Sequence, residues 1–281
     1  MRPTIRLGNL YGIPVGLHWS IAIIVGLVTF GLAGTLLPAA AAGYASSAYL
    51  IVGLVVSAGL LASIVAHELG HALVARNNGV GTRAINLFAL GGVAELESEA
   101  DNPGAAARIA LAGPAVSVAI GAGSLAAAGV AGALGVPALL VAAFTILGVI
   151  NLIMAVFNMI PALPLDGGRV LQAALWKRRG DREQATISAA EVGRVLGWAI
   201  VAFGFWSFLN GGAGLWTMVI GWFVVTSARA EAMRARFLIK RREWAPPQWW
   251  DLRSTGPVID VTGRPVDPNQ PADPSEPQRV G

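Results

Sequence analysis

Two histidines and a glutamate occur together in the run His67-Glu68-Leu69-Gly70-His71. If this run is helical, residues four apart lie one turn apart on the same face, so the two histidines can bind one metal ion. Zinc accepts imidazole nitrogen readily, and a catalytic zinc site has three protein ligands and a fourth position for water. A carboxylate beside that position can act as a general base, the role predicted for Glu68. The spacing therefore predicts metal-assisted hydrolysis.

The surroundings of this run are unusually apolar. Between Arg6 and Glu68 the ionisable groups are His18, His67 and three tyrosines, and residues 109–165 contain no Asp, Glu, Lys or Arg. A charge at the centre of a membrane helix costs roughly 2.5 to 3.5 kcal/mol or more. One alternative is that these are buried helix residues that hydrogen-bond to neighbouring helices. Three rare groups at a metal-binding spacing favour a metal site.

A third ligand must come from elsewhere in the chain. There is no cysteine and only one further histidine, His18, so a carboxylate is the other choice. Asp166 is the stronger candidate, because it follows an uncharged apolar stretch that ends at the depth expected for the histidines. Pro161 and Pro164 interrupt that helix, and the two glycines after Asp166 permit a tight turn. Asp166 could alternatively cap the following amphipathic segment, and both roles could hold together.

The elements that carry these residues are expected to be membrane helices. Of the 281 residues, 55% are hydrophobic and 13% are charged, which is outside the balance of soluble globular domains. A helix needs about 20 apolar residues to span a bilayer core. The sequence predicts an all-α polytopic membrane protein with six transmembrane helices, near residues 16–37, 47–76, 106–129, 136–160, 190–209 and 213–235.

The distribution of basic residues predicts the orientation of these helices. The connections near 38–46, 130–135 and 210–212 carry no charge, whereas arginine and lysine gather in the alternate connections. By the positive-inside rule, both termini are cytoplasmic, in the cell membrane, and the site lies toward the cytoplasmic face. The same rule accounts for the net charge of +4, so we expect a lipid bilayer and no nucleic acid as partner.

The composition changes near the C-terminus. Eight of the 16 prolines follow Glu243, mixed with Asp, Gln and Ser. This composition is typical of disordered segments. We therefore expect a membrane domain in residues 1–242 and a disordered, proline-rich cytoplasmic tail in residues 243–281.

Two further segments bear on the site. The stretch AINLFALGGVAELE, residues 84–97, could form a small membrane-associated β-hairpin whose free edge pairs with an extended substrate, or merely a loop that covers the site. Gly113, Ser117 and Gly121 recur every four positions, as expected where one helix packs closely on another. For these three residues a structural role is predicted.

Two signatures together resemble those of a known family. With HELGH in a predicted transmembrane helix and NMIPALPLDGGR after a later one, the chain resembles the site-2 protease family of intramembrane zinc metalloproteases. Three lesser features agree with the family pattern over residues 10–235: GIPVGLHWS at 12–20, GGVA at 91–94 and AGP at 112–114.

The resemblance implies roles for individual residues. It implies one Zn²⁺ per chain, bound by His67, His71 and Asp166, with Glu68 as catalytic base. Asn158 matches an asparagine proposed in the family to bind the substrate backbone or the developing oxyanion. A helix-interior asparagine that bonds a neighbouring helix is the alternative for Asn158.

The resemblance also implies a type of substrate. It would be a single-pass transmembrane protein, in the family often an anti-sigma factor or a membrane-tethered transcription factor. The chain lacks a PDZ-like insertion between the motifs and ends in a proline-rich tail where some relatives carry CBS domains, so regulation by adenine nucleotides is not implied.

An alternative from another class is a membrane zinc carrier or sensor without hydrolytic activity, although a carrier does not need Glu68 beside the histidines.

Overall fold

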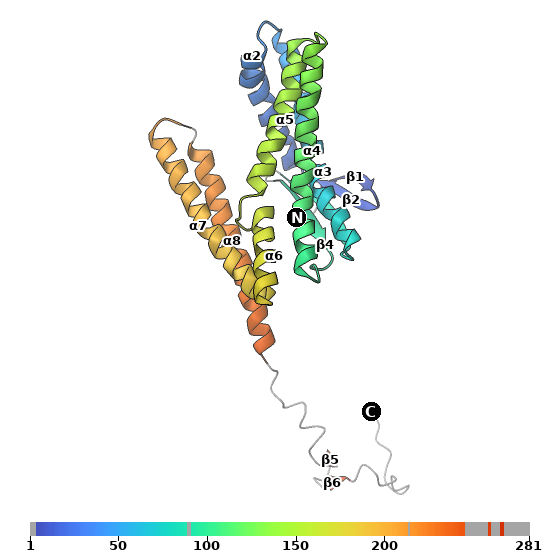
Figure 1. Ribbon diagram of the computed structural model, residues 1–281, viewed down its shortest axis with the longest axis vertical. Helices are drawn as coiled ribbons and strands as arrows, with labels where there is room; N and C mark the ends of the chain where they lie inside the picture. Colours follow the sequence, from blue (N-terminus) through green and yellow to red (C-terminus); the bar gives the residue numbers. More distant parts are fainter. Residues whose placement is uncertain (1–3, 89–90, 213, 245–257, 260–264, 267–281) are drawn as a thin grey trace. The chain divides into compact units, whose positions relative to one another are not determined.

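The computed structural model describes residues 4–88, 91–212, 214–244, 258–259 and 265–266 (Figure 1). It forms two compact units, Met1–Phe237 and Leu238–Gly281. Most of the tail expected in residues 243–281 lies outside the described residues, so its disorder stays a prediction. Strands β5 (Val258–Ile259) and β6 (Pro265–Val266) are described there and pair antiparallel.

Long helices make up most of the first unit. In the described residues, five helical stretches are long and apolar enough to cross a membrane. The sixth predicted span falls in a helix that is not among the five, because several charged residues follow its apolar first half. The five are α1 to α2 (Ser20–Ala40, with a π-helical turn at Leu32–Leu36), α3 (Ser46–Asn77), α4 (Pro103–Ala133), α5 (Ala138–Asn158) and α7 (Arg182–Leu209); the other two helices are α6 (Asp166–Arg179) and α8 (Gly214–Glu243).

The fold is mostly helical, as predicted, and a small four-stranded sheet that includes the predicted β-hairpin accompanies the helices. Its order is β1 (Ile5–Leu10), β2 (Ile13–Leu17), β3 (Thr82–Phe88) and β4 (Gly91–Leu96). The predicted hairpin is present as β3 and β4, and β3 also pairs in parallel with β2. The sheet continues to β1 on that side and ends at β4 on the other. Among the strands that the structure describes, the hairpin is therefore paired at β3 and left with one free edge, at β4.

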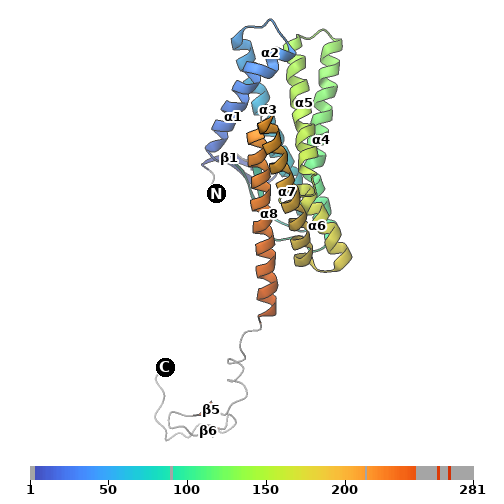
Figure 2. The same ribbon diagram turned by 90° about the vertical axis from the view of Figure 1, so that its left-hand side faces the viewer.

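Helix α3 carries the two candidate histidine ligands, His67 and His71. It packs against α1, α4, α5 and both strands of the hairpin. Helices α4 and α5 run side by side along most of their length in both views (Figures 1 and 2). Ile85 and Leu87 of β3 are buried against Ala72 of α3. The sheet and the helices thus hold α3 from several sides.

The start of α6 is fixed by the chain that precedes it. A Cβ added to Gly167 would lie 2.2 Å from the Met159 carbonyl oxygen, and one added to Gly168 would lie 2.3 Å from the Leu163 nitrogen. The two glycines therefore permit close packing within the first turn of α6, not the tight turn predicted before it. The N-cap residue is Leu165, without a side-chain cap bond, so Asp166 does not have the alternative role of N-cap.

Candidate metal centre

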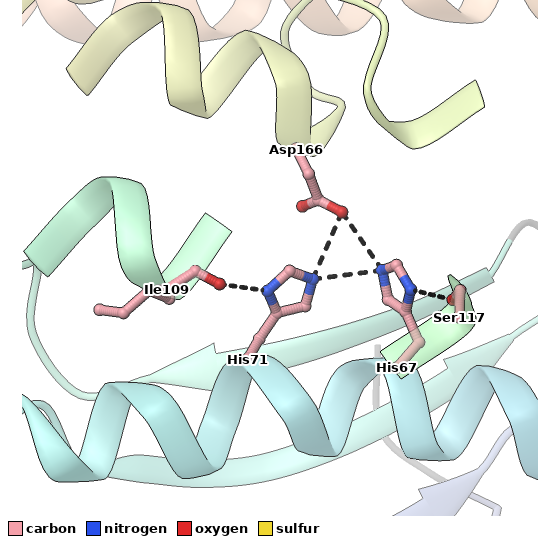
Figure 3. Close-up of polar contacts among 5 residues, drawn as sticks. All are labelled: His67, His71, Ile109, Ser117 and Asp166. Atoms are coloured by element: carbon pink, nitrogen blue, oxygen red, sulfur yellow. Dashed lines mark hydrogen bonds and ion pairs between the residues drawn. The ribbon is translucent and has the colours of Figure 1, made fainter. Parts of the chain in front are cut away.

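The predicted ligands from α3 and α6 converge (Figure 3). His67 Nε2 and His71 Nε2 lie 3.2 Å apart. Asp166 Oδ2 lies 3.2 Å from His67 Nε2 and 3.4 Å from His71 Nε2. His67 is 5% exposed and the other two side chains are largely buried. Residues 99 positions apart in the chain therefore meet at one point.

These distances fit a zinc ion. With bonds of about 2.0 to 2.1 Å in tetrahedral geometry, two zinc ligands lie about 3.3 Å from each other. The triangle formed by the two Nε2 atoms and Oδ2 has sides of 3.2, 3.2 and 3.4 Å. Two imidazole nitrogens and one carboxylate form a set of the type found in catalytic zinc sites, which keep the fourth position open.

The outer nitrogen of each imidazole has a partner on α4. His71 Nδ1 donates a hydrogen bond to the Ile109 carbonyl oxygen at 2.7 Å, and His67 Nδ1 lies 2.8 Å from Ser117 Oγ (Figure 3). A proton on Nδ1 leaves the Nε2 lone pair available to a metal, and such outer bonds fix the ring orientation. Helix α4 thus sets which nitrogen of each ring faces Asp166.

Gly113 and Ser117 have roles that the sequence analysis did not predict. A Cβ added to Gly113 would lie 2.2 Å from His71 Nε2 and 2.6 Å from His67 Nε2, so only glycine leaves room for the two rings. Ser117 is fully buried and contacts His67. Gly121 alone of the stripe packs against α5, near Gly148 and Leu152. The sequence did offer a signal, because Ser117 is a polar residue on a helix face of otherwise small, apolar residues.

We expect Ser117→Ala to weaken zinc binding roughly 10- to 100-fold, the usual effect of removing an outer-shell partner. The reason is that His67 loses the hydroxyl 2.8 Å from its Nδ1. Competition with a chromophoric chelator on the purified protein in detergent measures the affinity. Ser124→Ala, two turns further along α4, is the matched control. Equal affinity of Ser117→Ala and wild type would contradict the orienting role.

Asp166 is held as a carboxylate. Burial raises the pKa of Asp166, but hydrogen bonds with His67 and His71 outweigh this and lower the pKa to about 2. Asp166 is also the first residue of α6, where the helix dipole favours negative charge. The group is therefore ionised at neutral pH, the form that binds a metal.

Glu68 lies beside the three converging ligands and is not one of them. Its carboxylate faces the backbone N–H of Ala94 in β4. A Cβ added to Gly92 would lie 2.5 Å from Glu68 Cγ, so the strand passes directly over this side chain. Glu68 thus lies between the predicted ligands and the edge strand of the sheet.

The remaining two sequence candidates take no part in the contacts that join His67, His71 and Asp166. Asn158 is the last residue of α5 and half-buried, and its side chain makes no hydrogen bond with the residues that the structure describes. His18 directly follows β2, and its Nδ1 is 2.8 Å from Ser20 Oγ. The geometry therefore favours Asp166 over His18 as the third ligand.

Apolar helices around a buried His-His-Asp centre with an adjacent glutamate define the class of membrane metallohydrolases. The sequence profile of peptidase family M50 matches residues 55–135 and 122–200. The chain belongs to this family, which confirms the resemblance to the site-2 proteases, and it is a multi-pass membrane protein.

Individual relatives agree with this assignment. The chain is 43% identical over 236 residues to a protein described as zinc metalloprotease Rip3 from Mycobacterium tuberculosis, covering 83% of this chain and 60% of the relative. It is 40% identical over 238 residues to zinc metalloprotease sll0528 from Synechocystis sp., covering 84% and 62%. The chain thus spans about 60% of the length of these relatives.

A solved structure supports the fold. The site-2 protease from Methanocaldococcus jannaschii matches with a TM-score of 0.54 and 31% sequence identity. The match covers 81% of this chain and 94% of that chain.

Proposed function

We propose that the protein is an intramembrane zinc endopeptidase that hydrolyses a peptide bond in or near the transmembrane segment of single-pass membrane proteins. The observation that carries the proposal is the convergence of His67 Nε2, His71 Nε2 and Asp166 Oδ2 beside the carboxylate of Glu68, which is not one of the three ligands. The relatives described as zinc metalloproteases support the choice of metal and reaction.

Different groups of the chain have different roles in the proposed hydrolysis. Zinc, held by His67, His71 and Asp166, would polarise the scissile carbonyl and lower the pKa of water. Glu68 takes the proton of the attacking water and delivers it to the leaving amine. The backbone N–H of Ala94 faces the Glu68 carboxylate and helps to hold it toward the cleavage position.

The free edge of β4 is the proposed binding surface for the substrate. A peptide bond inside a helix is shielded, and lipid excludes the water that hydrolysis needs. The substrate must therefore be extended where it is cut. A strand added at the edge of β4 would run past Glu68, because Gly92 and Ala94 of β4 both approach that side chain.

Asn158 is proposed to hold the substrate backbone or the developing oxyanion. Its support is its place at the end of α5, eight residues before Asp166, with a side-chain amide that makes no hydrogen bond within the described residues. We expect Asn158→Ala to lower kcat roughly 10²- to 10³-fold with zinc still bound, as for loss of one oxyanion donor. An unchanged kcat in steady-state assays would argue against this role.

The proposal includes an orientation in the membrane. Six spanning helices with cytoplasmic termini place the centre toward the cytoplasmic face, so cleavage would release a cytosolic fragment. An anti-sigma factor is one substrate of this kind. The uncharged connections near 38–46 and 130–135 support this orientation.

The test is quantitative membrane proteomics on cells that express wild type or Glu68→Gln. We expect intact single-pass proteins to accumulate with the mutant and to co-purify with it, because the substrate binds and is not cut. A photocrosslinking residue in place of Val93, an exposed position of β4, should capture the same proteins. If no protein changes while purified wild type binds zinc, the carrier or sensor alternative is favoured instead.

A further inference from the structure

An apolar cavity of about 160 Å³ lies in the first unit between α1, α3, α5 and the hairpin. Val28 and Ile64 are among the side chains that line it. Ser57 is the one polar residue among the described lining residues, and its hydroxyl is already used: it donates to the Gly53 carbonyl and accepts from Thr29. The cavity therefore offers no free polar partner and suits an apolar group.

The cavity is lined by residues that are close in the chain to the proposed site of cleavage. Ile64 lines the cavity one helical turn before Glu68 on α3, a rise of about 6 Å. Gly91 lines it from β4, and the next residue, Gly92, packs against Glu68. The cavity is thus bounded in part by α3 and β4, the same two elements that flank the carboxylate.

The size of the cavity limits what can occupy it. An apolar cavity of about 150 Å³ in another protein stays dry and binds benzene. A volume of about 160 Å³ accordingly accepts a side chain the size of leucine, methionine or phenylalanine. Alanine would leave it mostly empty, and tryptophan would exceed it.

We propose that this cavity is a specificity pocket that receives one large apolar side chain of the substrate next to the scissile bond. The inference rests on the proposed endopeptidase function. An extended substrate paired with the edge of β4 directs alternate side chains to the same face of the sheet. One of them can enter the cavity while the adjoining peptide bond lies near Glu68, because Gly91 and Gly92 are consecutive in β4.

The test uses a library of single-pass test proteins in vesicles, each with a membrane segment randomised around its cytoplasmic end. Mass spectrometry gives the residues beside every cut. The zinc-loaded full-length enzyme is compared with Val28→Phe, which narrows the cavity, and Ile150→Ala, which widens it. Leu27→Phe is the matched control, because Leu27 neighbours Val28 on α1 and is 60% exposed on the outer face.

We expect wild type and Leu27→Phe to cut at least about tenfold better beside Leu, Met or Phe than beside Ala, the size of effect typical of apolar pockets. Val28→Phe should reverse this preference toward small residues, and the wider cavity of Ile150→Ala should admit Trp.

Cleavage by wild type with no preference for the residue beside the cut, as expected if a lipid chain fills the cavity, would overturn the inference. The inference would also be overturned if Val28→Phe lowered the cleavage rate equally for every residue beside the cut while Ile150→Ala kept the wild-type preference. If zinc-loaded wild type cuts nothing, the endopeptidase function itself fails.

Discussion

Glu68→Gln is expected to lower the rate of cleavage roughly 10²- to 10⁴-fold while the metal stays bound. Glutamine has the shape of glutamate and cannot accept the proton of the attacking water at neutral pH. Glu68 is not among the three converging ligand atoms, so metal content should not fall. Cleavage of the test proteins and zinc by atomic absorption, on the same purified sample, measure both quantities.

Glu97→Gln is the control for this substitution, because Glu97 is exposed just beyond β4 and far from the histidine rings in sequence. It should keep both zinc and activity. A zinc-loaded Glu68→Gln enzyme that cleaves at the wild-type rate would remove Glu68 from the role of general base. Loss of zinc from Glu68→Gln would instead make Glu68 part of the metal site.

Asp166→Ala is expected to lower the zinc content of the purified protein from one ion per chain to well below one. The substitution removes the oxygen that lies 3.2 and 3.4 Å from the two histidine nitrogens, and it leaves two ligands where a catalytic zinc site needs three. Activity should be lost with the metal. Zinc stoichiometry after size-exclusion chromatography in detergent is the direct measurement.

Asp101→Ala is the matched control, because Asp101 is an exposed aspartate in the connection before α4. It should retain one zinc per chain. Asp166→Glu adds a second arm to the test, since the longer carboxylate can still reach the histidines with altered geometry. Full zinc occupancy in Asp166→Ala would show that the third ligand is a different residue.

The convergence of the candidate ligands could be predicted from the sequence because its signal is local and chemically rare. His67, Glu68 and His71 share one helix, so helix geometry alone brings them together. To predict that Asp166 joins the histidines, it was enough to expect that two predicted spans end at the same depth in the membrane. The structure brings it to 3.2 Å from His67 Nε2. The long apolar spans were predictable for a similar reason, since hydropathy reports them directly.

Other features depend on contacts between distant segments and could not be predicted. Ser117 and Gly113 look like residues of any closely packed membrane helix until α4 is placed against the two imidazoles. Strand β2 pairs with β3 across about 70 residues of intervening chain, and no local pattern in either strand specifies that partner. The role of Gly167 and Gly168 likewise depends on the preceding segment folding back on α6.

The ligands of the proposed zinc ion come from both ends of a long chain segment. His71 and Asp166 enclose α4, α5 and the hairpin between them, and the chain has no cysteine with which to close that loop. A metal bound at both ends acts as a reversible cross-link, which restricts the unfolded chain in the manner of a disulfide. Zinc binding would then also stabilise the fold by mass action. Cells short of zinc would accordingly hold a protein that is both inactive and easier to unfold and degrade.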